Sequence, residues 1–143
     1  MEVSRNQQLM EGPRGRYQPP ERSVEIRPDL ELALTPQDLL KAPGKLYAAG
    51  DVALLRDTMR VAIIGARDSS EAGVRRAQKL ASLLAREGVV VVSGLAMGID
   101  HAAHRGSMAV KGGRTIAVIG TPLDKAYPAE HAALQEEIYR DHL

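Results

Sequence analysis

Three short glycine-containing segments hold the residues of this 143-residue chain that are best suited to binding a ligand. They read GARDSS (residues 65–70), SGLAMGID (93–100) and GTPLDKAYP (120–128). Arg67 in the first segment carries a guanidinium whose paired N–H groups match the oxygens of a phosphate. Glycine lets the backbone approach a ligand closely, and a helix that follows such a segment presents free N–H groups to an anion. We therefore interpret the three segments as parts of one phosphate-binding site.

Each segment also has a purely structural interpretation. In the first, Ser69 or Ser70 caps a helix and Arg67 is a solvated turn residue. In the second, the glycines form an ordinary turn and Asp100 is a natural N-cap. The third segment offers two further polar side chains, those of Thr121 and Lys125. Spacing alone leaves both interpretations open, and only the three segments together favour a ligand.

Several common kinds of catalytic and cofactor site have no counterpart in the sequence. There is no G-x-G-x-x-G segment for a dinucleotide and no G-x-x-x-x-G-K-[ST] segment for ATP. His101 and His104 are three residues apart but have no third metal ligand in sequence, and Ser93 is not in a G-x-S-x-G elbow. The chain has no cysteine. We therefore expect no cofactor, no metal and no catalytic residue, so that the chain is not an enzyme.

Short apolar runs alternate with amphipathic stretches along the second half of the chain. The runs are rich in Val and Ile, as buried strands are, and the stretches have apolar residues at helical spacing. Strands that alternate with helices pair in parallel, so their loops converge on one rim of the sheet, where ligands bind. The pattern predicts half of a doubly wound α/β fold. The expected strands are 61–65, 89–94 and 115–120, and the expected helices are 71–88, 100–111 and 129–141.

Composition limits the core and the charge of the site. Hydrophobic residues make up 44% of the chain, with no Phe or Trp, so the core must be aliphatic. The formal net charge is only +1, although residues 56–87 hold seven Lys or Arg against four acids, so a basic site must be local. We found neither a signal sequence nor a run of about 18 apolar residues. These features predict a protein of the cytoplasm without a membrane partner.

Longer motifs around the three segments resemble a known family. VAIIGARDSSEAG, VVSGLAMGIDHAAH and TIAVIGTPLDKAYPAEH are similar to successive core motifs of the DprA/Smf family of DNA-processing proteins, and PGKLYAAGDVALL resembles the segment before that core. The resemblance covers about residues 43–140. It implies an extended Rossmann fold that binds single-stranded DNA, dimerises and helps to load a RecA-type recombinase in transformation or recombination. The alternative is a nucleotide sensor or nucleotide-processing enzyme related to the LOG family, whose P-G-G-x-G-T segment is absent here.

Together, the resemblance and the segments define the predicted fold class, domains and site. The fold class is α/β, a Rossmann-like three-layer sandwich with a parallel sheet, incomplete at the C-terminus. Residues 1–34 are expected to form a flexible or extended arm, and residues 35–143 the truncated DprA/Smf-like domain. That domain is expected to begin with a helix capped by Thr35 and to continue with an extended stretch at 45–48 and a short helix near 52–59. The predicted nucleic-acid or phosphate-binding residues are Gly65, Arg67, Ser69, Ser93, Gly94, Gly98, Asp100, His104, Gly120, Thr121 and Lys125, and the resemblance adds Pro128.

Some features depart from the family pattern. Met97 stands where the family often has Arg, which removes one phosphate contact. The accessory N-terminal helical domain is replaced by a short tail, and the later core strands do not follow Leu143. The strand at 61–65 should then have an unpaired edge, so we expect a homo-oligomer or a second chain that completes the sheet. Two other interpretations remain: the N-terminal arm covers this edge, or the chain is a fragment with a mainly structural role.

Overall fold

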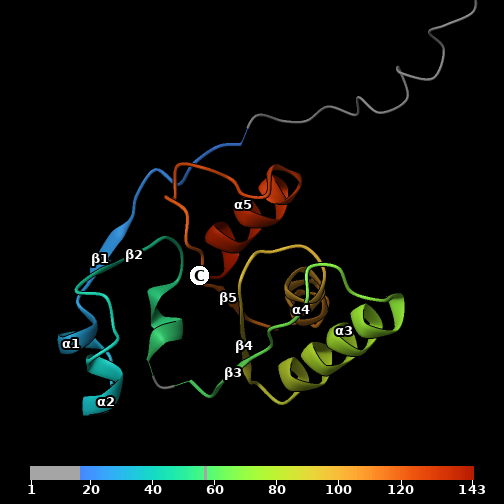
Figure 1. Cartoon of the computed structure of the whole chain (residues 1–143), viewed down its shortest axis with the longest axis horizontal. Coiled ribbons are helices and arrows are strands. Elements are labelled where there is room, and N and C mark those ends of the chain that lie inside the picture. Colours follow the sequence, from blue (N-terminus) through green and yellow to red (C-terminus); the bar gives the residue numbers. More distant parts are fainter. Residues whose placement is uncertain (1–16, 57) are drawn as a thin grey trace, which may run out of the picture.

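A sheet of three parallel strands forms the centre of the protein (Figure 1). The computed structural model describes residues 17–56 and 58–143. In space the strands lie in the order β3-β4-β5, so the predicted α/β class with a parallel sheet is confirmed. Each strand is shorter than predicted because the last residues of each apolar run leave the sheet and enter the loops. The strands are β3 (Arg60–Ala62), β4 (Val90–Ser93) and β5 (Thr115–Ala117).

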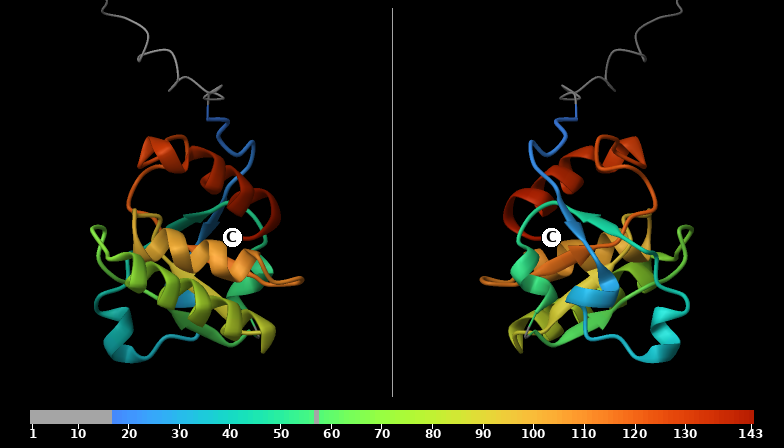
Figure 2. Two further views of the ribbon diagram at one scale, coloured as in Figure 1. Left: turned by 90° about the vertical axis from the view of Figure 1, so that its right-hand side faces the viewer. Right: turned by 90° about the vertical axis from the view of Figure 1, so that its left-hand side faces the viewer.

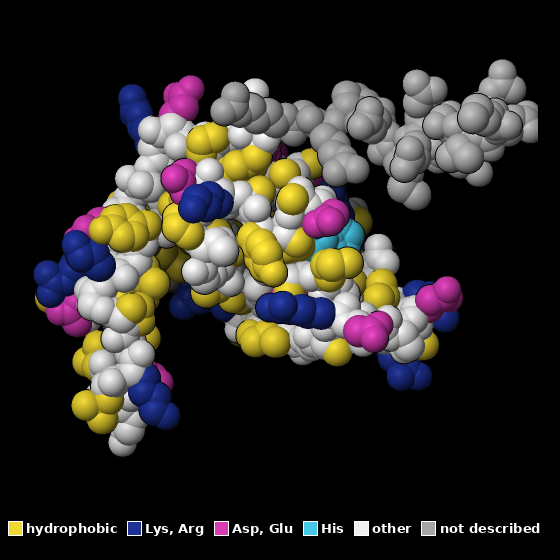
Figure 3. Space-filling view, turned by 45° about the horizontal axis from the view of Figure 1, so that its top comes forward, with side chains coloured by type: hydrophobic (Ala, Val, Ile, Leu, Met, Phe, Trp, Pro, Cys, Tyr) yellow, Lys and Arg dark blue, Asp and Glu magenta, His cyan; other side chains and the backbone are white. Residues whose placement is uncertain are grey.

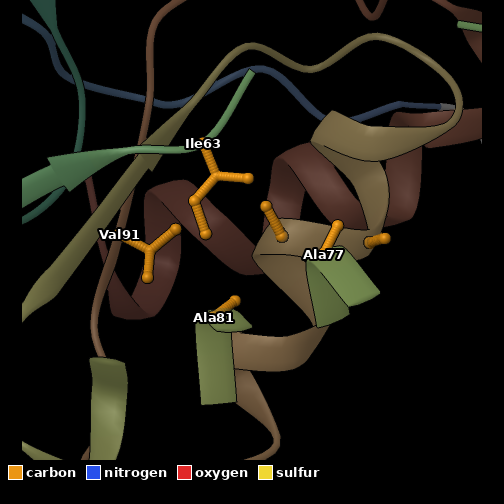
Figure 4. Close-up of a cluster of buried hydrophobic side chains, with 6 residues drawn as sticks. Ile63, Ala77, Ala81 and Val91 are labelled. Atoms are coloured by element: carbon orange, nitrogen blue, oxygen red, sulfur yellow. The ribbon is translucent and has the colours of Figure 1, made fainter. Parts of the chain in front are cut away.

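Two helices, α3 (Glu71–Arg86) and α4 (Ile99–Met108), cover one face of this sheet (Figures 1 and 2). Successive side chains of a strand point to opposite faces, and Val91 of β4 points towards the helices. The core on this side combines a few branched residues with alanines, which let the helices pack closely (Figure 4). Its buried members are Ile63, Ala77, Ala81, Val91, Ala102 and Ala103.

The opposite face of the sheet is covered by short elements from the first third of the chain (Figure 2). Strands β1 (Val24–Ile26) and β2 (Leu46–Ala48) form a separate antiparallel pair, and the 3-10 helix η1 (Val52–Leu55) places Leu54 against Val90 and Ile116. This third layer therefore lacks the long helix that a doubly wound fold would place there. Pairing of β1 with β2 crosses the domain boundary that we predicted after residue 34, and that boundary stays a prediction.

Helix ends follow local sequence signals at several positions. Ser70 caps α3, because its Oγ accepts a hydrogen bond from the Gly73 N–H at 3.2 Å. The cap predicted at Thr35 is confirmed: Thr35 Oγ1 accepts from the Asp38 N–H at 3.2 Å, at the start of α2 (Pro36–Leu39). One further short helix, α1 (Pro28–Glu31), was not predicted. No helix in the described part of the chain has the length and hydropathy to cross a membrane.

The C-terminal part packs against the end of β5. It consists of the 3-10 helix η2 (Ala129–His131) and α5 (Ala132–Asp141), whose Leu134 and Ile138 contact Leu95. Beyond α5, the Leu143 N–H donates to the Thr115 carbonyl at 3.3 Å and the Leu143 carbonyl accepts from Ala117 at 2.7 Å. Leu143 thus bonds to the outer edge of β5 without forming a further strand, and β3 has no strand partner on its outer edge among the described residues.

Helices α3 and α4 lie in close contact at Gly106. A Cβ atom at this position would collide with the carbonyl oxygen of Gln78 and lie 3.0 Å from the Cβ of Ala81. The two helices are also joined by Ser82, whose Oγ donates to the Gly106 carbonyl at 2.8 Å. Because the colliding atom belongs to the backbone, a larger residue must push the helices apart.

We predict that Gly106→Val lowers the free energy of unfolding by about 2–3 kcal/mol, as overpacked cores do. Urea unfolding followed by circular dichroism measures this change. Gly44→Val is the control, because nothing lies within 4 Å of a Cβ at Gly44, and its effect should stay within about 0.5 kcal/mol. Equal unfolding midpoints for the two variants would show that the helices do not depend on this close approach.

Candidate functional site

The loops that follow the three parallel strands meet around one cavity of about 270 Å³. All three strands point the same way, so their carboxyl ends and loops lie at one edge of the sheet. Five of the eleven predicted site residues line this cavity: Arg67, Gly94, Asp100, Gly120 and Thr121. Pro128, which the family resemblance added, lines it as well. We call this space the rim cavity.

Arg67 provides the positive charge of the rim cavity. Its side chain is exposed, and it makes no salt bridge or side-chain hydrogen bond with residues 17–56 or 58–143. The guanidinium is therefore free to bind an anion from solvent, through two parallel N–H groups. This position is compatible with the predicted phosphate contact.

Two of the predicted glycines hold the Arg67 loop in place without lining the cavity. Gly98 has φ of +79°, and a Cβ there would collide with the carbonyl oxygens of Ala66 and Arg67. A Cβ at Gly65 would lie 2.6 Å from Cγ1 of Ile99. Both glycines therefore allow the first loop to pack directly against the start of α4.

The helix starts near the site differ in part from the prediction. The alternative that Ser69 or Ser70 caps the first helix is confirmed for Ser70, which caps α3. Ser69 Oγ is buried without a hydrogen-bond partner among the described residues. Asp100 was expected to cap α4, and this is wrong: Gly98 is the N-cap and Asp100 lies in the first turn. Glu71 and Asp100 thus place a carboxylate at the start of each helix, where it compensates the helix dipole. An incoming anion must therefore depend mainly on Arg67.

Ser93 and His104 lie beneath the rim cavity and do not line it. Ser93 Oγ donates to the Ile63 carbonyl at 2.6 Å and so joins β4 to the end of β3. His104 is 0% exposed, with Nε2 bonded to the carbonyl of Gly94 and Nδ1 2.7 Å from Thr115 Oγ1. Because a carbonyl only accepts, Nε2 carries a proton, and the Thr115 hydroxyl, which has a single proton, lies within hydrogen-bond distance of both Nδ1 and the Val91 carbonyl, the latter at 2.9 Å. Both side chains position the end of β4, and their predicted role in binding stays a prediction.

Burial lowers the pKa of His104 from 6.5 to about 4. The ring is therefore neutral at pH 7 and offers no charge to a phosphate. His101, whose pKa is also lowered by burial, stacks on His131 with 4.7 Å between ring centroids. No group of three His, Asp or Glu side chains in the described part of the chain is arranged to hold a metal ion.

Apolar side chains that were not among the predicted site residues form much of the cavity wall. Tyr127 is 61% exposed, and Met97 and Val118 are more than half exposed. Figure 3 brings the α5 end of the molecule forward and shows hydrophobic side chains among separate Lys and Arg side chains, without a continuous basic surface. The available signal was the scarcity of aromatic residues, because a chain with four tyrosines and no Phe or Trp makes each tyrosine a candidate contact.

A second cavity of about 640 Å³ adjoins the first. The two share Ile119, Gly120 and Thr121, and the second adds Lys45 and Tyr47 from the β2 region. Lys45 Nζ lies 6.0 Å from the centroid of the Tyr47 ring and 3.1 Å from Glu25 Oε2. Sequence reasoning missed this cavity because its walls come from segments more than 70 residues apart.

Of the predicted residues on the third loop, Lys125 alone lies outside both cavities. Its side chain is exposed, while its carbonyl oxygen accepts a hydrogen bond from Gln135 Nε2 at 3.0 Å. Gly120 lies at the open side, since nothing is within 4 Å of a Cβ placed there. The third loop therefore contributes Gly120 and Thr121 to the two cavities but not the predicted lysine.

We predict that His104 makes the folded chain sensitive to acid. Its folded pKa of about 4 lies below the ordinary 6.5, so the unfolded chain takes up the proton first as the pH falls. Above pH 6.5 this pKa difference does not reduce the free energy of unfolding. As the pH falls from 6.5 towards 4, protonation of the unfolded chain lowers that free energy progressively. Between pH 7 and pH 5 this one group should lower the free energy of unfolding by about 2 kcal/mol.

Urea unfolding of His104→Gln at both pH values tests this, because the glutamine amide can donate to Gly94 but does not titrate. The difference between pH 7 and pH 5 should shrink by most of that amount. His101→Gln is the control and should keep most of the wild-type difference. A His104→Gln variant with the full wild-type pH dependence would contradict the prediction.

A family model and several curated relatives match this chain in sequence. The family model described as DNA recombination-mediator protein A matches residues 29–143. DNA processing protein DprA of Streptococcus pneumoniae is 43% identical over 106 residues, which cover 74% of this chain and 36% of that protein. The chain thus spans about a third of the length of the curated relatives that it matches first.

Two solved structures share the fold. The X-ray structure of DNA processing protein A from Streptococcus pneumoniae has a TM-score of 0.70 and 38% identity, covering 85% of this chain and 41% of that one. A structure of DNA processing protein A from Helicobacter pylori, described for its single-stranded DNA binding mode, has a TM-score of 0.69 and 33% identity over 84% of this chain and 53% of that one. Because the family model covers most of the chain and the fold agrees, this protein belongs to the DNA recombination-mediator protein A family, as the DprA/Smf-like motifs predicted.

Proposed function

We propose that this domain binds single-stranded DNA in a DNA-processing or recombination role, and that it acts by binding and not as an enzyme. One observation carries the proposal: Arg67, whose guanidinium is free, lines a mainly apolar cavity that adjoins a second cavity. Arg67 suits a phosphate, and the apolar walls suit the faces of bases. Family membership and the single-stranded DNA binding described for the Helicobacter pylori protein support the same ligand.

The paired cavities favour a strand over a mononucleotide. A mononucleotide would occupy only one of the two spaces, whereas consecutive nucleotides can follow the loop at 118–124 from one into the other. Tyr127 in the first cavity and Tyr47 in the second offer ring faces on which bases stack, a contact that tolerates any sequence. Under the LOG-type alternative, the ligand is one small nucleotide, which leaves the second cavity without a role in binding.

The wider role of the domain is part of the same proposal. We propose that it cooperates with a RecA-type recombinase, that it self-associates, and that it works in the cytoplasm. Self-association is supported by β3, which has no strand partner on the side away from β4 among the described residues. Met59 and Ile64, which flank β3, are largely exposed. Exposed strand edges of this kind recruit a further strand.

We predict that Arg67→Ala weakens binding of a labelled single-stranded oligonucleotide about tenfold, the loss expected for one charge-assisted contact. Fluorescence anisotropy at two salt concentrations measures this, and the slope of log K against log salt should fall by about 0.7. Unfolding should not change, because the side chain is exposed.

Arg76→Ala is the matched control for Arg67. Arg76 lies exposed on α3, lines neither cavity and carries the same charge. Its removal should change affinity much less than removal of Arg67. Equal losses of affinity in the two variants would show that only overall charge matters. In a competition experiment, an unlabelled mononucleotide that displaces the labelled oligonucleotide as well as an unlabelled oligonucleotide does would favour the LOG-type alternative.

We predict that the chain self-associates through β3 and that Met59→Lys with Ile64→Lys reduces this association, because charges at a strand edge oppose pairing. Light scattering over a wide range of protein concentrations measures it. Leu40→Lys is the control, since Leu40 is exposed on the distant α2 region and should leave association unchanged. A wild-type chain that stays monomeric at every concentration would refute the prediction.

A further inference from the structure

Asp100 places a buried carboxylate on the wall of the rim cavity. The residue is only 6% exposed, yet it lines the cavity. Its Oδ1 atom is buried and has no hydrogen-bond partner in the described part of the chain. A buried acceptor of this kind is costly unless a donor reaches it. The carboxylate therefore has no protein donor at Oδ1 in the described part of the chain, and because Asp100 lines the cavity, a donor group that enters the cavity can approach the carboxylate.

A phosphate is the wrong group for the part of the cavity next to Asp100. Two like charges 4 Å apart repel by about 4 kcal/mol at the effective dielectric of a protein surface. The cavity thus contains two different subsites: Arg67 suits an anion, and Asp100 suits a neutral hydrogen-bond donor. A nucleotide supplies both groups, a phosphate from its backbone and donors from its base.

The walls between these two residues suit the flat faces of a base. Tyr127, Met97 and Val118 are exposed there, and Leu95 and Ile119 complete the apolar lining. Aromatic and aliphatic side chains contact base faces without regard to sequence. A base that enters between them therefore meets the Asp100 carboxylate with its polar edge.

The Asp100 carboxylate is held against the end of β4. A Cβ at Gly94 would collide with Asp100 Oδ2, so only glycine permits the carboxylate to lie there. His104, one turn further along α4, is bonded to the Gly94 carbonyl and fixes the same strand end. An acceptor held in this way can discriminate between bases, because it has little freedom to adapt to a wrong edge.

We propose that, within the single-strand site proposed above, this subsite takes a base that carries an amino group, namely cytosine, adenine or guanine, in preference to thymine. The amino group donates to the Asp100 carboxylate where it borders the cavity. Thymine presents one donor, N3–H, between the O2 and O4 acceptors, which both repel a carboxylate, whereas the N4 amino group of cytosine has an acceptor on one side only, so the carboxylate favours cytosine. This inference concerns the selectivity of the site and rests on the proposed function.

The test compares labelled dC16 and dT16 by fluorescence anisotropy at pH 7.5, since the two homopolymers have the same ring size and charge. We expect wild-type protein to bind dC16 about five- to tenfold more tightly, the lower end of what one good base contact gives. A dC16 whose N4 atoms each carry two methyl groups lacks the amino donors and should bind no more tightly than dT16 does.

Asp100→Asn tests the residue itself. Asparagine has nearly the same shape, so the fold should persist, which unfolding curves verify. The preference for dC16 should fall to near unity. Asp141→Asn is the matched control: Asp141 is exposed at the end of α5 and lines neither cavity, so its loss removes the same charge but should leave the preference intact.

The outcomes separate the inference from the proposed function. If wild-type protein binds both oligonucleotides equally, the proposed function stands and the selectivity is refuted. If Asp100→Asn tightens binding of both and keeps their ratio, the carboxylate only repels the backbone, and the inference is again refuted. If neither oligonucleotide binds at all, the proposed function fails and the inference fails with it.

Discussion

The hydrogen bond between His104 and the carbonyl of Gly94 fixes the end of the central strand, on which the rim cavity is built. His104 reaches this carbonyl from α4 and meets Thr115 of β5 with its other nitrogen. One buried side chain thus joins a helix and two strands at the point where the loops diverge. Because burial keeps the ring neutral, it acts as an uncharged link in the core.

Close packing at glycine and alanine positions then determines how near the surrounding elements can come. Gly106 lets α4 lie against α3, and Gly98 lets the loop of Arg67 lie against the start of α4. A side chain at either position would collide with backbone carbonyl oxygens. The exposed charge of Arg67 and the buried charge of Asp100 are therefore placed on one cavity by steric limits, and not by an attraction between them.

The N-terminal third of the chain also contributes to the site. The β1–β2 pair and η1 cover the face of the sheet that α3 and α4 leave open. The same segment brings Lys45 and Tyr47 to the second cavity, and Tyr17 donates a hydrogen bond to the Leu123 carbonyl at 2.8 Å. Part of the segment that we expected to be a flexible or extended arm thus lies beside the third loop of the rim.

The sequence by itself determined the parallel sheet, the convergence of its loops and the family, because apolar runs, helical spacing and long motifs are local properties. It also singled out Arg67, which lines the rim cavity. Only the tertiary structure decided that Asp100 is buried without a partner, that His104 lies beneath the cavity, and that Tyr127 lines it. Burial and partners depend on contacts between distant parts of the chain, such as the 118 residues between Tyr17 and Gln135, and no local pattern encodes them.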